Sequence, residues 1–110
     1  MSTHTDDDAV YKALAHPRRR AMLDRLRDRP HTTGMLCEAL PEMDRCTVMQ
    51  HLKVLEAADL IIVRREGRER WNHLNSLPIK GIHDRWISEY AQHAVGVLQQ
   101  LKQDLEGAPD

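Results

Sequence analysis

The sequence has no long apolar run. Nothing in its 110 residues approaches the roughly 20 consecutive apolar residues that a membrane-spanning helix needs. Its first ten residues, MSTHTDDDAV, lack both the basic start and the apolar centre of a signal peptide. These absences argue against a membrane or secreted protein and predict a cytoplasmic one.

Cysteine is scarce, since Cys37 and Cys46 are the only two in the chain. Their separation of nine positions matches no zinc-binding pattern. Without a secretion signal a structural disulfide is not expected, so we predict two free thiols.

The motifs of catalysis are missing as well. We find no glycine-rich phosphate-binding loop, no serine or cysteine nucleophile with an evident histidine and carboxylate partner, and no distinct pair of carboxylates. The sequence therefore predicts a protein that is not an enzyme and that has no cofactor.

What is present is an uneven distribution of charge, although the net charge is only −1. Residues 16–30 hold six arginines against two aspartates, and residues 45–70 hold six basic against four acidic side chains. A phosphate backbone responds to local potential rather than to net charge, so these two segments suggest a nucleic-acid partner. An arginine run alone is more often a solvated helix face than a binding site.

Apolar periodicity and capping residues predict a mainly α chain that carries one small β-hairpin. The four predicted N-terminal helices are residues 8–15 with Asp8 as N-cap, a helix from Pro17 to about Arg29, a short helix capped by Thr32 or Thr33 and ended by Pro41, and a helix capped by Asp44.

After Asp59 the pattern changes from helical to extended. The predicted hairpin has strands at Leu60–Val63 and Trp71–Asn75, with Arg64–Arg68 as the turn. From Pro78 the chain is predicted to be helical again for about 28 residues. We expect one domain over residues 8–106, with flexible ends at 1–7 and 107–110.

This order, α-α-α-α-β-β-α, is that of a winged helix-turn-helix, in which the fourth helix enters the major groove of DNA. Val48, Leu52 and Leu55 form its apolar inner face. The predicted DNA-binding residues of this helix are Arg45, Cys46, Thr47, Met49, Gln50, His51 and Lys53. Gln50 can pair with adenine and Arg45 with guanine, whereas His51 and Lys53 are expected on the DNA backbone.

The hairpin adds four further predicted DNA contacts, Arg64, Arg65, Arg68 and Arg70. They surround a flexible Glu66-Gly67 tip and can straddle phosphates or reach a minor groove. The alternative is a structural hairpin whose arginines pair with its own glutamates.

Three stretches, YKALAHPRRRAMLDRL, CTVMQHLKVLEAADLI and VRREGRERWNHLN, together span residues 11–75. In combination they resemble the bacterial arsenic-repressor-like (ArsR/SmtB) winged-helix regulators. The resemblance implies a homodimeric, operator-binding repressor that is released by a metal ion or another signal. The chain departs from the family pattern at His16-Pro17, where Asp-Pro is usual, in a longer loop at residues 41–43, and at Asp59, where glycine is common.

The metal sites of such regulators are not reproduced. The positions of the family's Cys-x-Cys pair correspond to Thr32 and Gly34, and the zinc ligands of the last helix are incomplete. We therefore predict no metal site, with a site between subunits from His83, Asp84 and His93 as the alternative. A second alternative is a redox-responsive repressor that uses Cys46, because oxidation there would place a bulky or charged group against DNA.

The last helix carries more apolar surface than a lone terminal helix of so small a domain requires. We predict a homodimer through the first and last helices that binds a palindromic operator in double-stranded DNA. The predicted interface residues are Tyr11, Leu14, Trp86, Tyr90, Val97, Leu98, Leu101 and Leu105. A protein-binding adaptor on the same scaffold is the competing class of function.

Overall fold

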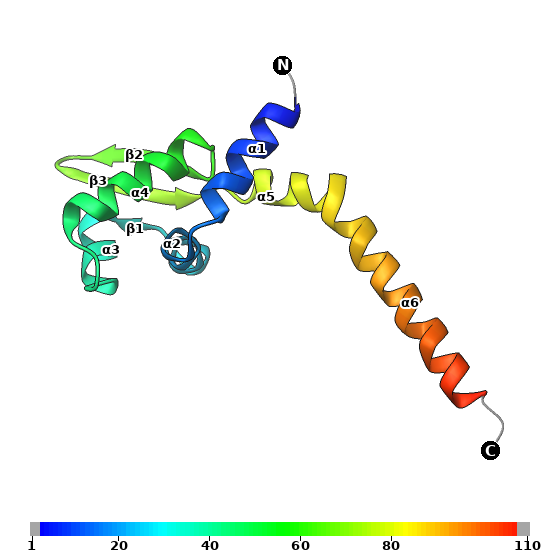
Figure 1. Ribbon diagram of the computed structural model, residues 1–110. Helices are drawn as coiled ribbons and strands as arrows, with labels where there is room; N and C mark the ends of the chain where they lie inside the picture. Colours follow the sequence, from blue (N-terminus) through cyan, green and yellow to red (C-terminus); the bar gives the residue numbers. More distant parts are fainter. Residues whose placement is uncertain (1–2, 108–110) are drawn as a thin grey trace. The chain divides into compact units, whose positions relative to one another are not determined.

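Four helices precede the hairpin in the computed structural model, which describes residues 3–107, with side chains from Asp7 onward (Figure 1). They are α1 (Thr3–Leu14), α2 (Pro17–Asp28), α3 (Thr33–Ala39) and α4 (Arg45–Ala57). The prediction for α1 was wrong at its start: the helix begins at Thr3, so Asp8 lies inside it and is not its N-cap. Residues 1–2 and 108–110 of the predicted flexible ends lie outside the described residues.

Side chains cap the next three helices. His16 Nδ1 accepts a hydrogen bond from the backbone N–H of Arg18 at 3.1 Å, so the unusual His16-Pro17 pair still provides a cap for α2. Of the two candidates for α3, Thr32 is the N-cap, through its bond from the Met35 N–H at 3.1 Å. Asp44 caps α4 as predicted, accepting from the Thr47 N–H at 2.7 Å.

The C-terminal end of α4 explains why glycine would suit position 59. Asp59 has a φ of 60°, in the left-handed region that L-residues rarely adopt. The Leu60 N–H donates to the Leu55 carbonyl at 2.9 Å and the Asp59 N–H donates to the Glu56 carbonyl at 3.0 Å. This pair of bonds is the Schellman motif, which turns the chain out of the helix and into the hairpin.

A three-stranded antiparallel sheet follows, with the order β1-β3-β2. Its strands are β1 (His31–Thr32), β2 (Ile61–Glu66) and β3 (Glu69–Leu74), of which β1 was not predicted. The hairpin turn was predicted too long: Glu66 pairs with Glu69, so only Gly67 and Arg68 form the loop. Gly67 has a φ of 62°, the left-handed conformation that a two-residue hairpin turn requires.

The core of this part of the chain is aliphatic. The inner face of α4 is confirmed, because Val48, Leu52 and Leu55 are all buried. Asn72 on β3 is fully buried, and its amide donates to the His31 carbonyl at 3.2 Å. This side-chain hydrogen bond links β3 to β1, in addition to the backbone pairing of the two strands.

The chain divides into two units by its contacts, residues up to Ile79 and residues from Lys80 onward. The single domain over residues 8–106 stays a prediction. The helical stretch predicted from Pro78 is confirmed, and it consists of α5 (Leu77–Ile82), a π-helical segment η1 (His83–Ile87) and α6 (Ser88–Glu106). The Ser88 N–H donates to the His83 carbonyl, five residues back, which defines the π-helical turn.

The order of elements in the described residues confirms the predicted winged helix-turn-helix, with α3 and α4 as the helix-turn-helix and β2-β3 as the wing. None of the described helices combines the length and the apolar character that crossing a membrane would demand.

Candidate nucleic-acid interface

The outward side of α4 is accessible over most of its length. Five of the predicted contact residues on this helix are exposed: Arg45, Cys46, Met49, Gln50 and Lys53. Behind them, Val48, Leu52 and Leu55 fix the helix on the core. The helix therefore displays a mixed face of cationic, amide and apolar groups, which is the combination that reads base edges.

The first turn of α4 is fixed by Asp44. Hydrogen bonds from the backbone and the side chain of Thr47 hold the pKa of the Asp44 carboxyl below its ordinary value. Thr47 itself is half-buried. A capped and rigid first turn holds the N-terminal end of α4, which carries Arg45 and Cys46, in one orientation.

His51 lies on a different side of α4 from the exposed residues. It is half-buried, its ring centre is 4.6 Å from that of His16, and its Nδ1 is 3.5 Å from a guanidinium nitrogen of Arg19. Burial lowers the pKa of His51 first, and the positive charges of His16, Arg19 and Arg18 lower it further. His51 thus joins α4 to the start of α2.

The basic segment at residues 16–30 is partly structural. Arg19 donates to the carbonyls of Ala13 at 2.7 Å and Lys12 at 3.0 Å, and Arg20 donates to the Leu14 carbonyl at 2.7 Å. These carbonyls belong to the last turn of α1, which has no intrahelical donors for them. Two of the six arginines in the segment therefore stabilise the end of a helix.

The wing distributes its arginines over two faces. Arg65 and Arg70 are directly paired across β2 and β3, so they share the face that carries the buried Asn72 two residues along β3. Arg64 lies on the opposite face, with its Nε 3.5 Å from a carboxylate oxygen of Glu66. Arg64 therefore pairs with a glutamate of its own strand, as the structural alternative describes, while its side chain remains 75% exposed.

Arg70 is held by a residue that the sequence analysis did not single out. One guanidinium nitrogen of Arg70 lies 3.3 Å from each carboxylate oxygen of Glu56, in the last turn of α4. Glu56 and Arg70 are 14 positions apart, so no local pattern predicts that they pair. The only hint in the sequence was the large number of charged residues at 45–70. The bond links α4, the helix predicted to read DNA and called the reading helix below, to the wing.

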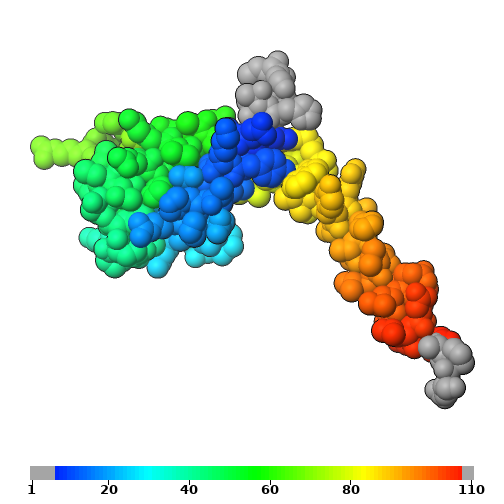
Figure 2. All heavy atoms as spheres, viewed as in Figure 1, coloured from blue at the N-terminus to red at the C-terminus, as the bar shows by residue number. Residues whose placement is uncertain are grey.

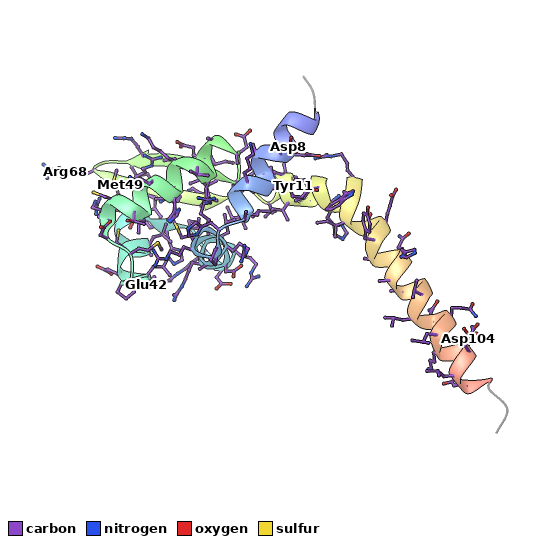
Figure 3. The ribbon with its side chains drawn as sticks, viewed as in Figure 1. Asp8, Tyr11, Glu42, Met49, Arg68 and Asp104 are labelled. Carbon is purple, nitrogen blue, oxygen red and sulfur yellow. The ribbon has the colours of Figure 1, made fainter. Side chains whose placement is uncertain are left out.

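Two hollows open between α4, the start of α3 and the wing. One, of about 300 Å³, is lined by Thr33, Cys46, Met49, Gln50, Leu52, Lys53 and Arg70. The other, of about 340 Å³, includes Arg45, Arg65, Arg68 and Arg70 in its lining. Met49 lines both, and Figure 3 shows it on α4 with Arg68 at the tip of the wing. The tip extends beyond the body formed by α1–α4, as Figure 2 shows in pale green.

The cysteines and histidines include the residues considered for redox sensing and metal binding. Cys46 is exposed and Cys37 is half-buried, and both are free thiols as predicted. His83 Nδ1 lies 3.3 Å from a carboxylate oxygen of Asp84. Within the described residues no three His, Cys, Asp or Glu side chains gather into a possible metal site, and His93 accordingly does not join His83 and Asp84 within one chain.

The predicted interface residues of the last helix are exposed. No residue of α6 is buried, and Trp86, Tyr90, Val97, Leu98, Leu101 and Leu105 are each more than half exposed. The rings of Trp86 and Tyr90 lie 5.1 Å apart in an edge-on arrangement. Tyr11 and Leu14, on α1, are half-buried.

Comparison with protein families adds an independent observation. Residues 14–64 match a family model described as a helix-turn-helix domain. These residues run from the end of α1 through α4 and into β2, so the match covers the helix-turn-helix but only part of the wing.

Individual proteins extend the likeness. The chain is 43% identical over 70 residues to the HTH-type transcriptional regulator Rv2034 of Mycobacterium tuberculosis, covering 64% of each protein and so less than two thirds of that relative. It is 34% identical over 86 residues to the uncharacterized HTH-type transcriptional regulator YuzN of Bacillus subtilis, covering 73% of this chain and 94% of YuzN.

Among solved structures, the chain is similar to the crystal structure of an ArsR family transcriptional regulator, RHA00566. The TM-score is 0.71 at 28% sequence identity, and the match covers 80% of this chain and 89% of the other. The winged arrangement described above is thus shared with a regulator of that family.

Proposed function

Because the chain belongs to the helix-turn-helix transcriptional regulators and has the winged fold of their ArsR-type members, we propose that it is a dimeric, sequence-specific repressor. It binds a palindromic operator in double-stranded DNA and leaves it in response to a signal. Its place of action is the cytoplasm, where bacterial DNA lies. Repression and release are carried over from the family resemblance.

One observation carries the DNA-binding part of this proposal: the exposed face of α4. Gln50 and Arg45 offer the bidentate donors and acceptors that suit adenine and guanine, and Met49 offers an apolar contact for a thymine methyl group. A solvated helix face would instead carry glutamate and lysine in alternation. The face is backed by buried leucine and valine, so its direction is fixed.

A dimer is supported by the surface of α6. Tyr90, Ala94, Val97, Leu101 and Leu105 recur at intervals of three and four and form one continuous stripe along a 19-residue helix. So large an exposed apolar patch is unusual on a monomer. A second copy of the same helix covers it in a two-fold arrangement, which requires the two α4 helices to stand about 34 Å apart, one turn of DNA.

Cys46 supplies a candidate release signal. Its thiol is exposed in the first turn of α4, where an oxidised, charged sulfur would face the DNA phosphates. Peroxide should then release the protein from its operator, and Cys46→Ser should bind but not respond. Binding that peroxide leaves unchanged would remove this signal from the proposal.

The proposal is tested by selecting bound duplexes from random DNA and then measuring Gln50→Ala on the selected site. We expect this variant to lose about 1–3 kcal/mol of discrimination at one base pair per half-site. Gln99→Ala, the same change on exposed α6, is the matched control and should keep the wild-type preference. An adaptor that binds only protein would show no salt-sensitive attachment to any duplex.

A further inference from the structure

The hollow between the N-terminal end of α4 and the wing is lined by arginines from α4, from both strands of the wing and from the turn between them. Arg45 comes from α4, Arg65 and Arg70 from the paired strands, and Arg68 from the turn. We infer that this hollow is a clamp for a single phosphate of the DNA backbone, held jointly by Arg45, Arg65 and Arg68. The inference rests on the proposed DNA binding and assigns a subsite within it.

Arg65 and Arg70 lie directly opposite each other on β2 and β3. Like charges directly opposite each other on one face of an antiparallel pair are destabilising. Glu56 neutralises Arg70 by accepting from it at 3.3 Å on both carboxylate oxygens. Arg65 remains beside this neutralised pair, and its position in the register turns it toward the helices rather than away from them.

In the described part of the chain, the three other arginines of the hollow, Arg45, Arg65 and Arg68, have no carboxylate bound to them. Within residues 7–107 no carboxylate lies within the 4.0 Å of an ion pair from the guanidinium of Arg45, Arg65 or Arg68, although Glu69 also lines the hollow. By contrast, Arg64 on the outer face has Glu66 at 3.5 Å. Arg45, Arg65 and Arg68 thus share the hollow with a single acid, Glu69, and the remaining excess of positive charge makes a site for an anion.

The chemistry of these arginines favours phosphate as the anion. Guanidinium groups match phosphate oxygens in geometry and remain charged at all relevant pH values. Arg45 and Met49 line this hollow and also belong to the exposed face of α4. A duplex whose bases meet that face carries its own backbone across the hollow, so the phosphate is one of the duplex and not a free ion.

A clamp for one phosphate makes a quantitative prediction. The slope of log K against log salt changes by about 0.9 for each phosphate that the protein neutralises. The triple variant Arg45→Gln/Arg65→Gln/Arg68→Gln should therefore lower the slope on the selected operator by about 0.9 per protomer. Three arginines on three separate phosphates would lower it by about 2.7, and that result would overturn the clamp.

A scan of the operator with neutral methylphosphonate linkages tests the same point on the DNA. Wild-type protein should lose affinity at one main position per half-site, and the triple variant should be insensitive there. Arg25→Gln, which removes an exposed arginine of α2 that does not line the hollow, should retain both the wild-type slope and the wild-type sensitivity. Circular dichroism and thermal unfolding confirm that each variant is folded.

Calorimetry with inorganic pyrophosphate on the DNA-free protein separates the two possible sources of phosphate. Tight binding that the triple variant loses would assign the hollow to a free phosphorylated ligand and overturn the backbone assignment. Failure of the clamp remains distinct from failure of the proposed function, because in the latter case wild-type protein would show no salt-sensitive binding to any duplex.

Discussion

The imidazole rings of His16 and His51 lie 4.6 Å apart and join the first turn of α2 to the middle of α4. Arg19 approaches the same His51 ring at 3.5 Å, and Arg18 adds positive charge nearby. Two histidines and two arginines thus meet beside the middle of α4. A proton on His51 is disfavoured there both by burial and by these charges.

This relationship predicts a loss of stability in mild acid. The pKa of His51 is lowered in the folded protein from its ordinary 6.5, so above that pH His51 is neutral in both the folded and the unfolded chain. As the pH falls below about 6.5, the unfolded chain binds a proton more readily than the folded one. The free energy of unfolding should therefore decrease as the pH is lowered from about 7 through 6.5.

Urea unfolding of wild-type protein and of His51→Gln over this pH range measures the effect. The variant should show a shallower decrease, because the proton uptake by His51 is gone. His16→Gln should fall between the two, since it removes one of the neighbouring charges but leaves the burial of His51 in place. Parallel pH profiles for all three proteins would contradict the prediction.

Asp59 offers a second prediction, on stability alone. Glycine adopts its φ of 60° without the steric penalty that an L-residue carries. The hydrogen bonds at this corner use backbone groups of residue 59, including a carbonyl that accepts from the Asn75 amide at 2.8 Å, so they survive the substitution. Asp59→Gly should raise the free energy of unfolding by about 1 kcal/mol.

Thermal denaturation of Asp59→Gly and Asp59→Ala separates conformation from charge. Both variants remove the carboxylate, but only glycine relieves the backbone. Equal stability of the two variants would show that the left-handed conformation costs nothing at this position.

The parts of the fold that the sequence predicted are those governed by neighbours along the chain. The fourth helix was placed correctly because Asp44 caps it and Val48, Leu52 and Leu55 recur on one face. The strand β1 was missed because its two residues become a strand only by pairing with β3, about 40 positions later. Local pattern contains no signal for such a pairing.

The same limit applies to the candidate site. The exposed face of α4 followed from periodicity, but the different roles of the wing arginines did not. Arg64 and Arg65 are adjacent in sequence, yet one pairs with Glu66 and the other faces the hollow, because successive strand residues point to opposite faces. The turn had been predicted to include both arginines, and this difference of face appears only once the shorter turn fixes the register.

The link between Glu56 and Arg70 yields a third prediction. The pair is partly exposed, with side-chain exposures of 46% and 30%, so we expect a coupling of about 0.5–1 kcal/mol rather than that of a buried ion pair. A double-mutant cycle with Glu56→Gln, Arg70→Gln and the combined variant measures it by urea unfolding. The combined variant should be more stable than the sum of the single losses implies. Strict additivity would mean that the bond does not hold the wing to α4.

The final prediction concerns the proposed dimer and uses two valines that are equally exposed, at 53% each. Val97 lies on the apolar stripe of α6, whereas Val95, two positions earlier, lies on nearly the opposite side of the same helix. Val97→Lys should place an ammonium group in the covered interface and dissociate the dimer at micromolar concentration, because a buried unpaired charge is costly. Val95→Lys introduces the same charge and should leave the dimer intact.

Sedimentation velocity distinguishes these outcomes. Operator binding should weaken only in the variant that dissociates, since each monomer then contributes a single reading helix. A wild-type monomer, or an equal response of the two valines, would mean that the stripe on α6 does not mediate self-association.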